Sequence, residues 1–452
     1  MPTSSDLARH ADHRSRFLAA LGDDAALLFS PPEVLRNGDA EYRYRQSSDL
    51  LWLTGWEQPE CAVLLRPGAD EPFIMFVQKK DKEREVWTGR RPGPEGACER
   101  YGADAAYEFS ELASRLPDLL QGYRQLHYAV AEDGDRDRMV VQALRSARRK
   151  ARRNGLAVPD AFVDPGRVLH ELRLFKSEAE LELLQTAADI TAAAHLRAMG
   201  ITAPGVPEYV LEAEISHVFR VRGGSGPGYT TIVGGGANAT ILHYIENAAP
   251  LRDGDLVCVD AGCEYGWYTA DVTRTWPVNG RFTEPQRALY EAVLASQEAA
   301  IEASVPGATF MDVHDAATRS LVVSMVRLGL LEGDADDPAC IDAVISEEQH
   351  KRYYMHGTSH WLGMDVHDVG AYAADGSSRV LAPGMVLTIE PGLYVAEDDD
   401  EAPEAFRGIG IRIEDDVLVT PDGPRVLTAA VPKAVDEVEA AVGAALVDAA
   451  AR

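Results

Sequence analysis

Acidic side chains interrupt two strand-like runs in DLVCVDAGCEYGWYTADVTRTW, residues 255–276, and this pattern constrains the fold strongly. The apolar runs favour strands, and Gly266 between them favours a turn. If the chain turns about its midpoint, near Tyr265 and Gly266, then Asp260 and Asp271 lie opposite each other across a hairpin. Directly opposed residues in an antiparallel pair have Cβ atoms roughly 4.5–5.5 Å apart, and like charges there are destabilising. A positive charge should therefore lie between these two carboxylates.

Two further carboxylates lie on apolar strand-like segments. Glu390 ends the apolar run of TIEPGLY, and Glu414 lies in GIGIRIEDD. The alternation of that second segment puts Arg412 and Glu414 on one face of a strand and the isoleucines on the other. A surface position would explain any one of these carboxylates taken singly. Four of them on apolar strands require a partner, because a charge buried without one is costly.

Histidines are concentrated in YYMHGTSHWLGMDVHDVG, which contains His356, His360 and His367, and His243 lies in TILHYIEN. A single histidine is more often a hydrogen-bonded core residue than a ligand, but three so close together favour a functional site. Carboxylates with one imidazole form a hard, oxygen-rich ligand set that suits manganese, iron(II), cobalt or zinc. Carboxylates that can bridge imply two ions, and such a pair can activate a water molecule and polarise a carbonyl group.

The length of 452 residues predicts two domains, since single cores usually stop growing at roughly 250–300 residues. Ser177 and Glu180 form a capping box ahead of a long apolar helical period. We place the boundary near residue 172, which gives domains 1–172 and 173–452.

The two predicted domains differ in how strands and helices follow one another. The first alternates strand-like runs such as CAVLLRP and PFIMFVQ with helical stretches such as ELASRLPDLLQ, which indicates an open α/β sheet. The second mixes strands with amphipathic helices at about 207–222, 284–304 and 310–331, without strict βαβ alternation. This order favours an α+β domain with a mostly antiparallel sheet.

The composition limits the classes of partner that the protein is expected to bind. The formal net charge of −28 disfavours binding to nucleic acid or anionic lipid, and we interpret the basic stretch Arg148–Arg153 as a solvated helix face. The charged N-terminus and the lack of any uncharged apolar run of about 18 residues predict no exported or membrane-spanning segment. Five cysteines without a CxxC pair argue against disulfides and thiolate zinc sites, and favour a cytoplasmic protein.

Taken in order, these segments resemble a known family. The contexts VDAG, ADVTRT, HGTSHWLG, TIEPGLY and GIRIEDD resemble the metal-ligand pattern of the pita-bread metallopeptidases. The resemblance covers nearly all of 173–452 and extends more weakly to WLTGWEQPECAVLL and VWTGRRPGPEGA in the first domain. Within the family, SHWLGMDVHDVG and DVTRTWPVNGRFTEPQR resemble aminopeptidase P more closely than the dipeptide-specific prolidases.

The resemblance implies a fold, an activity and a role for each site residue. The expected fold is an N-terminal α/β domain followed by a pita-bread α+β catalytic domain, and the expected activity is release of the N-terminal residue from peptides with proline second. Two divalent ions, expected to be Mn²⁺, would be held by Asp260, Asp271, His360, Glu390 and Glu414, with Asp271 and Glu414 bridging. Glu390 would also act as general base or shuttle, helped by His243, His356, His367 and Arg412, with Tyr394 beside the peptide.

Oligomer contacts are a further expectation of the resemblance. The chain is expected to form a homo-oligomer, either a dimer or a tetramer. Trp87 in VWTGRRP would then approach the active site of a neighbouring subunit, although a packing role explains it equally well.

Two alternatives remain open. A prolidase would use the same metals but accept only Xaa-Pro dipeptides. A pita-bread protein that has lost catalysis would act as a binding module, but such relatives lack the metal ligands that this chain retains.

Overall fold

The computed structural model describes residues 4–444, so residues 1–3 and 445–452, the outer ends of the two predicted domains, lie outside the described residues. The chain divides into two compact units, Met1–Leu172 and Arg173–Arg452. Each unit has its own hydrophobic core.

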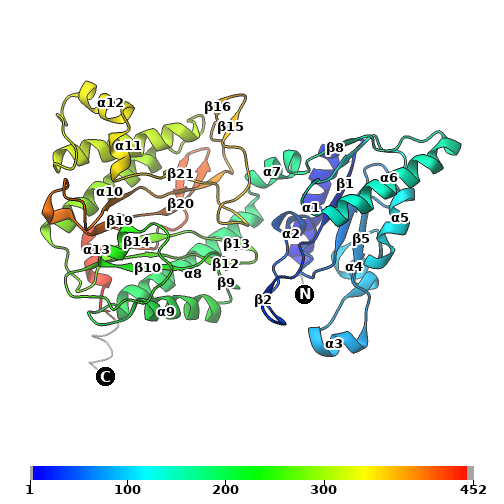
Figure 1. The fold of residues 1–452 in the computed structure, drawn as a ribbon, viewed down its shortest axis with the longest axis horizontal. Helices are drawn as coiled ribbons and strands as arrows, with labels where there is room; N and C mark the ends of the chain where they lie inside the picture. Colours follow the sequence, from blue (N-terminus) through cyan, green and yellow to red (C-terminus); the bar gives the residue numbers. More distant parts are fainter. Residues whose placement is uncertain (1–3, 445–452) are drawn as a thin grey trace. The chain divides into compact units, whose positions relative to one another are not determined.

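The first unit is built on a six-stranded mixed sheet with the order β6-β5-β4-β1-β7-β8 (Figure 1). Strand β1 pairs antiparallel with β4 and parallel with β7, which makes the sheet mixed. The strands are β1 (Ala25–Phe29), β2 (Leu35–Asn37), β3 (Ala40–Glu41), β4 (Ala62–Leu65), β5 (Phe73–Val77), β6 (Ala105–Glu108), β7 (Gln125–His127) and β8 (Ala161–Val163). The helices are α1 (Ser4–Leu21), α2 (Ser48–Thr54), α3 (Lys82–Thr88), α4 (Gly93–Tyr101), α5 (Leu112–Leu119), α6 (Gly134–Asn154) and α7 (Gly166–Leu174), whose last two residues belong to the second unit.

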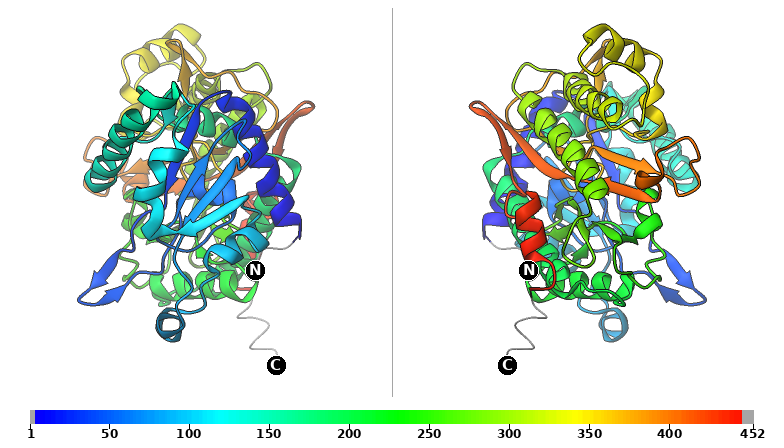
Figure 2. Two further views of the ribbon diagram at one scale, coloured as in Figure 1. Left: turned by 90° about the vertical axis from the view of Figure 1, so that its right-hand side faces the viewer. Right: turned by 90° about the vertical axis from the view of Figure 1, so that its left-hand side faces the viewer.

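Helices flank this sheet on opposite sides, with α1 on one side and the α5–α6 pair on the other (Figure 2, left). Helix α6 begins at the cap Asp133, whose carboxylate accepts two backbone N–H groups, and ends at Gly155 in the left-handed conformation. Its basic side chains within 148–153 are exposed while Ala147 and Ala151 are buried. The interpretation of that stretch as a solvated helix face is confirmed.

The second unit pairs its strands in an antiparallel manner throughout the described residues. Its strands are β9 (Gly226–Pro227), β10 (Ile232–Gly235), β11 (Leu256–Asp260), β12 (Cys263–Tyr265), β13 (Tyr268–Thr269), β14 (Thr273–Pro277), β15 (Ala373–Ala374), β16 (Ser377–Ser378), β17 (Val386–Ile389), β18 (Gly392–Val395), β19 (Ile409–Arg412), β20 (Asp415–Thr420) and β21 (Gly423–Val426). Its helices are α8 (Glu178–Ile201), α9 (Glu208–Val221), α10 (Glu284–Ala303), α11 (Phe310–Arg327), α12 (Pro338–Ser346) and α13 (Val435–Ala441).

Helices cover these short sheets. Helix α8 packs against β12 and β13, α9 packs against β9 and β10, and α10 packs against β17, β18 and β19 (Figure 1). The capping box predicted at Ser177 and Glu180 opens α8. The core beneath the helices includes Phe219, Trp276 and Tyr290, all fully buried. The predicted α+β organisation with an antiparallel sheet is confirmed.

The hairpin register differs from the prediction. The chain turns at Gly266 and Trp267, both with positive φ, instead of at Tyr265 and Gly266. Asp260 therefore pairs with Thr273, and Asp271 lies two residues from direct opposition. The prediction that Asp260 and Asp271 oppose each other was wrong by two residues, because the two-residue turn centres one position later than the midpoint of the segment.

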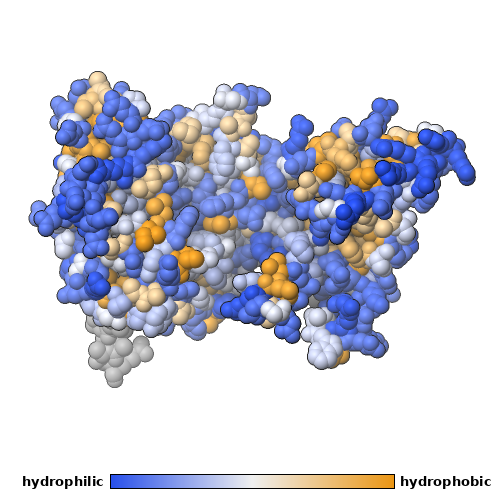
Figure 3. All heavy atoms as spheres, in the orientation of Figure 1, coloured by the Kyte–Doolittle hydropathy of each residue, from blue (hydrophilic) through white to orange (hydrophobic). Residues whose placement is uncertain are grey.

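The surface agrees with the charged composition. The face drawn in Figure 3 is mostly hydrophilic, with small separate apolar areas. Within residues 4–444, no helix is both long and apolar enough to cross a membrane.

Candidate active site

A cavity of about 500 Å³ in the second unit gathers most of the residues singled out in the sequence. Its lining includes all five predicted metal ligands and four of the predicted assisting residues: Asp260, Asp271, His360, Glu390, Glu414, His243, His356, His367 and Arg412. Segments far apart in the sequence thus form a single site.

The ends of strands carry the acidic residues of the cavity. Asp260 ends β11, Glu390 follows β17 directly, and Glu414 lies between β19 and β20. Asp271 lies in the short segment between β13 and β14. On the strand that carries Arg412, the side chain faces the cavity, while the neighbouring isoleucines at 411 and 413 belong to the core, as the alternation predicted.

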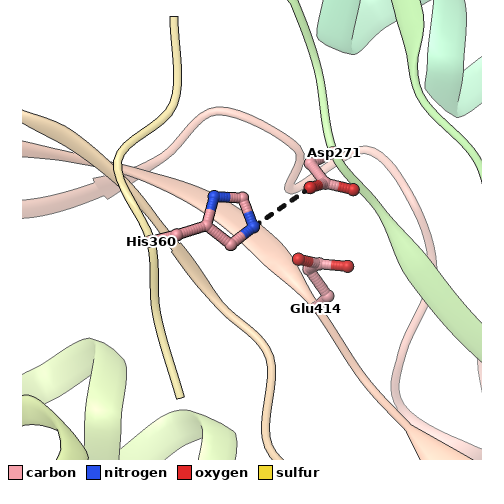
Figure 4. Close-up of side chains that lie close together, drawn as sticks. All are labelled: Asp271, His360 and Glu414. Atoms are coloured by element: carbon pink, nitrogen blue, oxygen red, sulfur yellow. Dashed lines mark ion pairs between the residues drawn. The ribbon is translucent and has the colours of Figure 1, made fainter. Parts of the chain in front are cut away.

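Three side chains at the centre could share an ion. One ligand atom from each of Asp271, His360 and Glu414 lies within 4.8 Å of the others (Figure 4). The Nε2 atom of His360 lies 3.3 Å from Asp271 Oδ2 and 3.5 Å from Glu390 Oε1. His360 Nδ1 donates to the carbonyl of Trp361 at 3.1 Å. The ring therefore turns Nε2 toward the carboxylates, where a proton or a metal ion must lie between them.

Electrostatics at the centre favour a cation. Burial raises the pKa of Asp271 and Glu414, and the neighbouring carboxylates raise both further. Burial also raises the pKa of Glu390 to about 8. Burial opposes protonation of His360, but Asp271 and Glu390 outweigh it and raise the pKa of His360 to about 9. Buried carboxylates that hold onto protons, together with an imidazole that keeps its proton beside them, mark a centre that favours positive charge, which a divalent metal ion would supply.

Asp260 is held by two hydrogen-bond donors at the edge of this centre. Arg412 donates to Asp260 Oδ2 at 2.7 Å, and the hydroxyl of Tyr229 donates to Oδ1 at 2.6 Å. Both carboxylate oxygens therefore have a donor in the protein. Sequence reasoning missed Tyr229, although it lies next to a predicted strand in the GPGYTTIVGGG segment.

A chain of hydrogen bonds leads from Arg412 to His356. Arg412 donates to the Tyr394 hydroxyl at 3.1 Å, and that hydroxyl lies 2.9 Å from His356 Nε2. His356 Nδ1 donates to the carbonyl of Gly357, so Nε2 accepts from Tyr394. Burial, with Arg412 nearby, lowers the pKa of His356 to about 4. His356 is therefore a neutral imidazole held in one orientation.

The other predicted residues take different positions. The ring of His367 lies edge-on to His360, with centroids 4.5 Å apart, and burial lowers the pKa of His367. His243 lines the same cavity, from the segment between β10 and β11. Trp87 belongs to the first unit, where it lies on α3 with 88% of its surface exposed, and its contact with a neighbouring subunit stays a prediction.

Two buried residues that the sequence did not suggest support the central ligands. The Thr273 hydroxyl donates to Glu414 Oε2 at 2.7 Å, and Asp416 accepts the backbone N–H of Asp271. Both lie in the quoted segments DVTRT and IEDD, directly beside predicted ligands, and that adjacency was the available signal.

Family models match both parts of the chain. Residues 182–421 match the model of metallopeptidase family M24, and residues 10–128 match that of the aminopeptidase P N-terminal domain. The first match alone covers more than half of the chain. The chain belongs to metallopeptidase family M24.

The chain is similar to members of this family over most of its length. The Xaa-Pro aminopeptidase of Escherichia coli is 47% identical over 93% of this chain and 94% of its own length. The human Xaa-Pro aminopeptidase 3 is 35% identical over 92% of this chain and 80% of its own length. The predicted resemblance to aminopeptidase P is confirmed.

Solved structures of M24 aminopeptidases match the fold. The structure of Pseudomonas aeruginosa aminopeptidase PepP superposes with a TM-score of 0.93 at 43% identity, covering 99% of each chain. An Escherichia coli aminopeptidase P variant in complex with substrate superposes with a TM-score of 0.91 at 44% identity, over 97% of this chain and 99% of that one. The predicted fold class is confirmed, and the chain has the divalent metal site of an M24 metallopeptidase.

Proposed function

We propose that this chain is a metal-dependent Xaa-Pro aminopeptidase, which releases the N-terminal residue from peptides with proline at the second position. The observation that carries the proposal is the cluster of Asp271, His360 and Glu414 within 4.8 Å, in a cavity that Asp260 and Glu390 also line. The 47% identity to a protein of that name supports the same activity.

Two divalent ions, Mn²⁺ by preference, are the cofactors that we propose. Asp271 and Glu414 would bridge them, Asp260 would complete the ligands of one ion, and His360 with Glu390 would complete those of the other. A pair of such ions supplies an activated water and stabilises the negative charge that develops on a carbonyl oxygen. Several hard metals fit this ligand set, so metal supply also decides which one is bound.

Protein groups around the ions would position the peptide and move protons. Glu390 Oε2 lies 4.0 Å from His356 Nδ1, and both side chains are largely buried. We assign the acceptance and return of a proton to the Glu390 carboxylate. Arg412 and Tyr394 fix the orientation of His356, while His243 and His367 would hold the substrate on the other side of the cavity.

The substrate preference has a physical basis. The peptide bond before proline has no N–H group to donate, and the ring fixes φ. Apolar side chains in the cavity lining suit a pyrrolidine ring: Ile232, Leu242, Ile245 and Val366. The carboxylates of the same lining would attract the free amino group of the peptide.

Hydrolysis of a matched pair of peptides tests the proposal. Metal-stripped protein resupplied with Mn²⁺ would be given a proline-second tripeptide and the corresponding Xaa-Pro dipeptide, and release of the first amino acid would be followed. We expect metal-dependent cleavage of the tripeptide, and loss of that activity in Asp271→Ala. Cleavage of the dipeptide alone would assign a prolidase, and activity on neither peptide would favour a binding module.

The same proposal includes an organisation for the whole chain. We propose a cytoplasmic homo-oligomer, a dimer or tetramer, that binds peptide but neither nucleic acid nor membrane, with functional domains 1–172 and 173–452. Light scattering would measure the oligomer. Reduced peptide activity in Trp87→Ala, or in a chain truncated to 173–452, would support a contribution of the first domain to the site, whereas an unchanged rate would exclude it.

A further inference from the structure

Thr358 lies midway between His356 and His360, in a segment without helix or strand. It is 1% exposed. Backbone hydrogen bonds tie the segment to β17: the N–H of Leu362 donates to the carbonyl of Val386, and the N–H of Thr388 donates to that of His360. Side-chain hydrogen bonds must fix what this backbone pairing leaves free.

The hydroxyl of Thr358 connects the segment to the buried ring of Tyr354 and to the half-buried ring of His314. It lies 2.5 Å from the Tyr354 hydroxyl and 2.8 Å from His314 Nδ1, which comes from α11. His314 Nε2 in turn lies 3.4 Å from the Thr318 hydroxyl. A hydroxyl can donate once and accept twice, so Thr358 can satisfy both neighbours.

Through Tyr354, this network reaches His356. The rings of Tyr354 and His356 pack edge to face, with centroids 5.0 Å apart. Tyr354 is 1% exposed, so its ring is confined by the core and its hydroxyl depends on Thr358. Any displacement of Thr358 would therefore shift the surface on which His356 rests.

Through its backbone, the same residue reaches Glu390. The carbonyl of Thr358 accepts the N–H of Glu390 at 2.8 Å. Two residues further on, the N–H of His360 donates to the Thr388 hydroxyl at 3.1 Å. The segment is thus aligned along the end of β17, at the point where Glu390 enters the cavity.

We propose that Thr358 is a positioning residue, whose hydroxyl, held between Tyr354 and His314, fixes His356 and Glu390 relative to each other. This inference rests on the proposed aminopeptidase function, because it assigns a role in that reaction. Thr358 is not one of the residues that line the cavity. It acts through Tyr354 and His314.

Near-isosteric substitutions separate the hydroxyl from the volume of the side chain. Thr358→Val removes the hydroxyl, and Thr358→Ser retains it. We expect Thr358→Val to lower kcat by about 10- to 100-fold on the proline-second tripeptide, with little change in KM, because a misplacement of about 1 Å can cost that much. Thr358→Ser should remain within about threefold of the wild-type kcat, since it keeps the same hydrogen bonds.

A control variant separates positioning from loss of stability. Thr202 is equally buried, and its hydroxyl accepts the indole N–H of Trp276 away from the cavity. Thr202→Val should lower the Tm but leave kcat unchanged. Equal kcat in Thr358→Val and the wild type would overturn the proposal, and so would an equal kcat loss in Thr202→Val.

Two further measurements complete the test. If Thr358→Val fails to fold, Tyr354→Phe removes the other end of the same hydrogen bond and should give the same loss in kcat; a wild-type kcat in Tyr354→Phe would then overturn the proposal. Hydrogen exchange reports on position without any substrate: the amide of Glu390 should exchange faster in Thr358→Val and at the wild-type rate in Thr358→Ser. An unchanged exchange rate would overturn the proposal, whereas inactivity of the wild type on both peptides would overturn only the proposed function.

Discussion

The carboxylate of Asp416 accepts the backbone N–H of Asp271, with its Oδ2 atom 3.1 Å from that nitrogen. Asp416 lies on β20 and is 1% exposed, whereas Asp271 lies between β13 and β14. Strand β20 thereby holds the backbone of Asp271, a proposed bridging ligand that lies outside the sheet of β20. The contact fixes where the Asp271 side chain starts, which a metal site requires.

Removal of this contact should weaken metal binding. We predict that Asp416→Ala lowers metal affinity by about 10- to 100-fold, as loss of a group that orients a ligand typically does. Asp416→Asn retains an oxygen that can accept the N–H and should lose less. Titration calorimetry of the metal-stripped proteins would measure both, and an unchanged affinity in Asp416→Ala would exclude the role.

His243 should contribute to turnover and not to metal binding. It lines the cavity but lies outside the cluster of Asp271, His360 and Glu414. We expect His243→Ala to keep its metal and to lose most of its kcat/KM, by about 10²-fold or more if it assists proton transfer. Elemental analysis checks the first part, and metal loss there would make His243 a ligand instead.

Asp368 should be essential for stability. Its carboxylate forms ion pairs with Arg173 at 2.6 Å and with Lys176 at 3.0 Å. The side chains of Asp368 and Lys176 are both 1% exposed. Asp368→Ala would leave two buried cations without that carboxylate, and we expect the free energy of unfolding to fall by about 3–5 kcal/mol.

An exposed pair provides the control for Asp368. Arg287 and Glu291 are about half exposed, at 50% and 53%, so Glu291→Ala should cost less than about 1 kcal/mol. Urea unfolding of both variants measures the difference. Equal losses would mean that the cluster around Asp368 is solvated.

His10 should make the stability of the protein sensitive to acid. Its Nδ1 donates to the carbonyl of Trp52 at 3.0 Å. Its Nε2 lies 3.5 Å from the guanidinium of Arg9, and His13 and Arg14 are nearby. Burial lowers the pKa of His10 from 6.5 to about 4, so the folded state keeps the ring neutral while the unfolded state takes up a proton. Stability from this residue is complete above pH 6.5 and is lost as the pH falls toward 4.

The loss from His10 amounts to about 3 kcal/mol at most. We expect the free energy of unfolding of the wild type to fall more steeply from pH 7 to pH 5 than that of His10→Gln. Urea unfolding at a series of pH values compares the two slopes. Parallel slopes would show that the imidazole takes up its proton equally in both states.

Much of the fold followed from periodicity and capping. The helix predicted at 284–304 is α10 (Glu284–Ala303), and the one at 310–331 is α11, which ends at Arg327. Both signals are local, since a capping residue and an apolar stripe act within a few turns of one helix. The hairpin register was not local in this sense, because it depended on which two residues adopt positive φ.

The metal ligands of the site were predictable from the sequence, but the residues that hold them in place were not. Aspartate, glutamate and histidine on apolar strands are visible in a sequence because they violate its pattern. Tyr229 and Thr358 fit their surroundings as ordinary polar residues, and only the folded chain brings their hydroxyls against Asp260 and His314. Such contacts join segments whose sequence separation carries no information about distance.

The buried carboxylates at the centre of the cavity make the folded fraction of the protein depend on metal. Without a cation, burial raises the pKa of Asp271 and Glu414, and neighbouring carboxylates raise both further, at a cost to the folded state. An ion that binds only the folded chain relieves that cost. The folded fraction then depends on the free concentration of divalent ions. Chains made during metal shortage would open more often and meet proteases sooner, so that enzyme abundance itself would follow the metal supply.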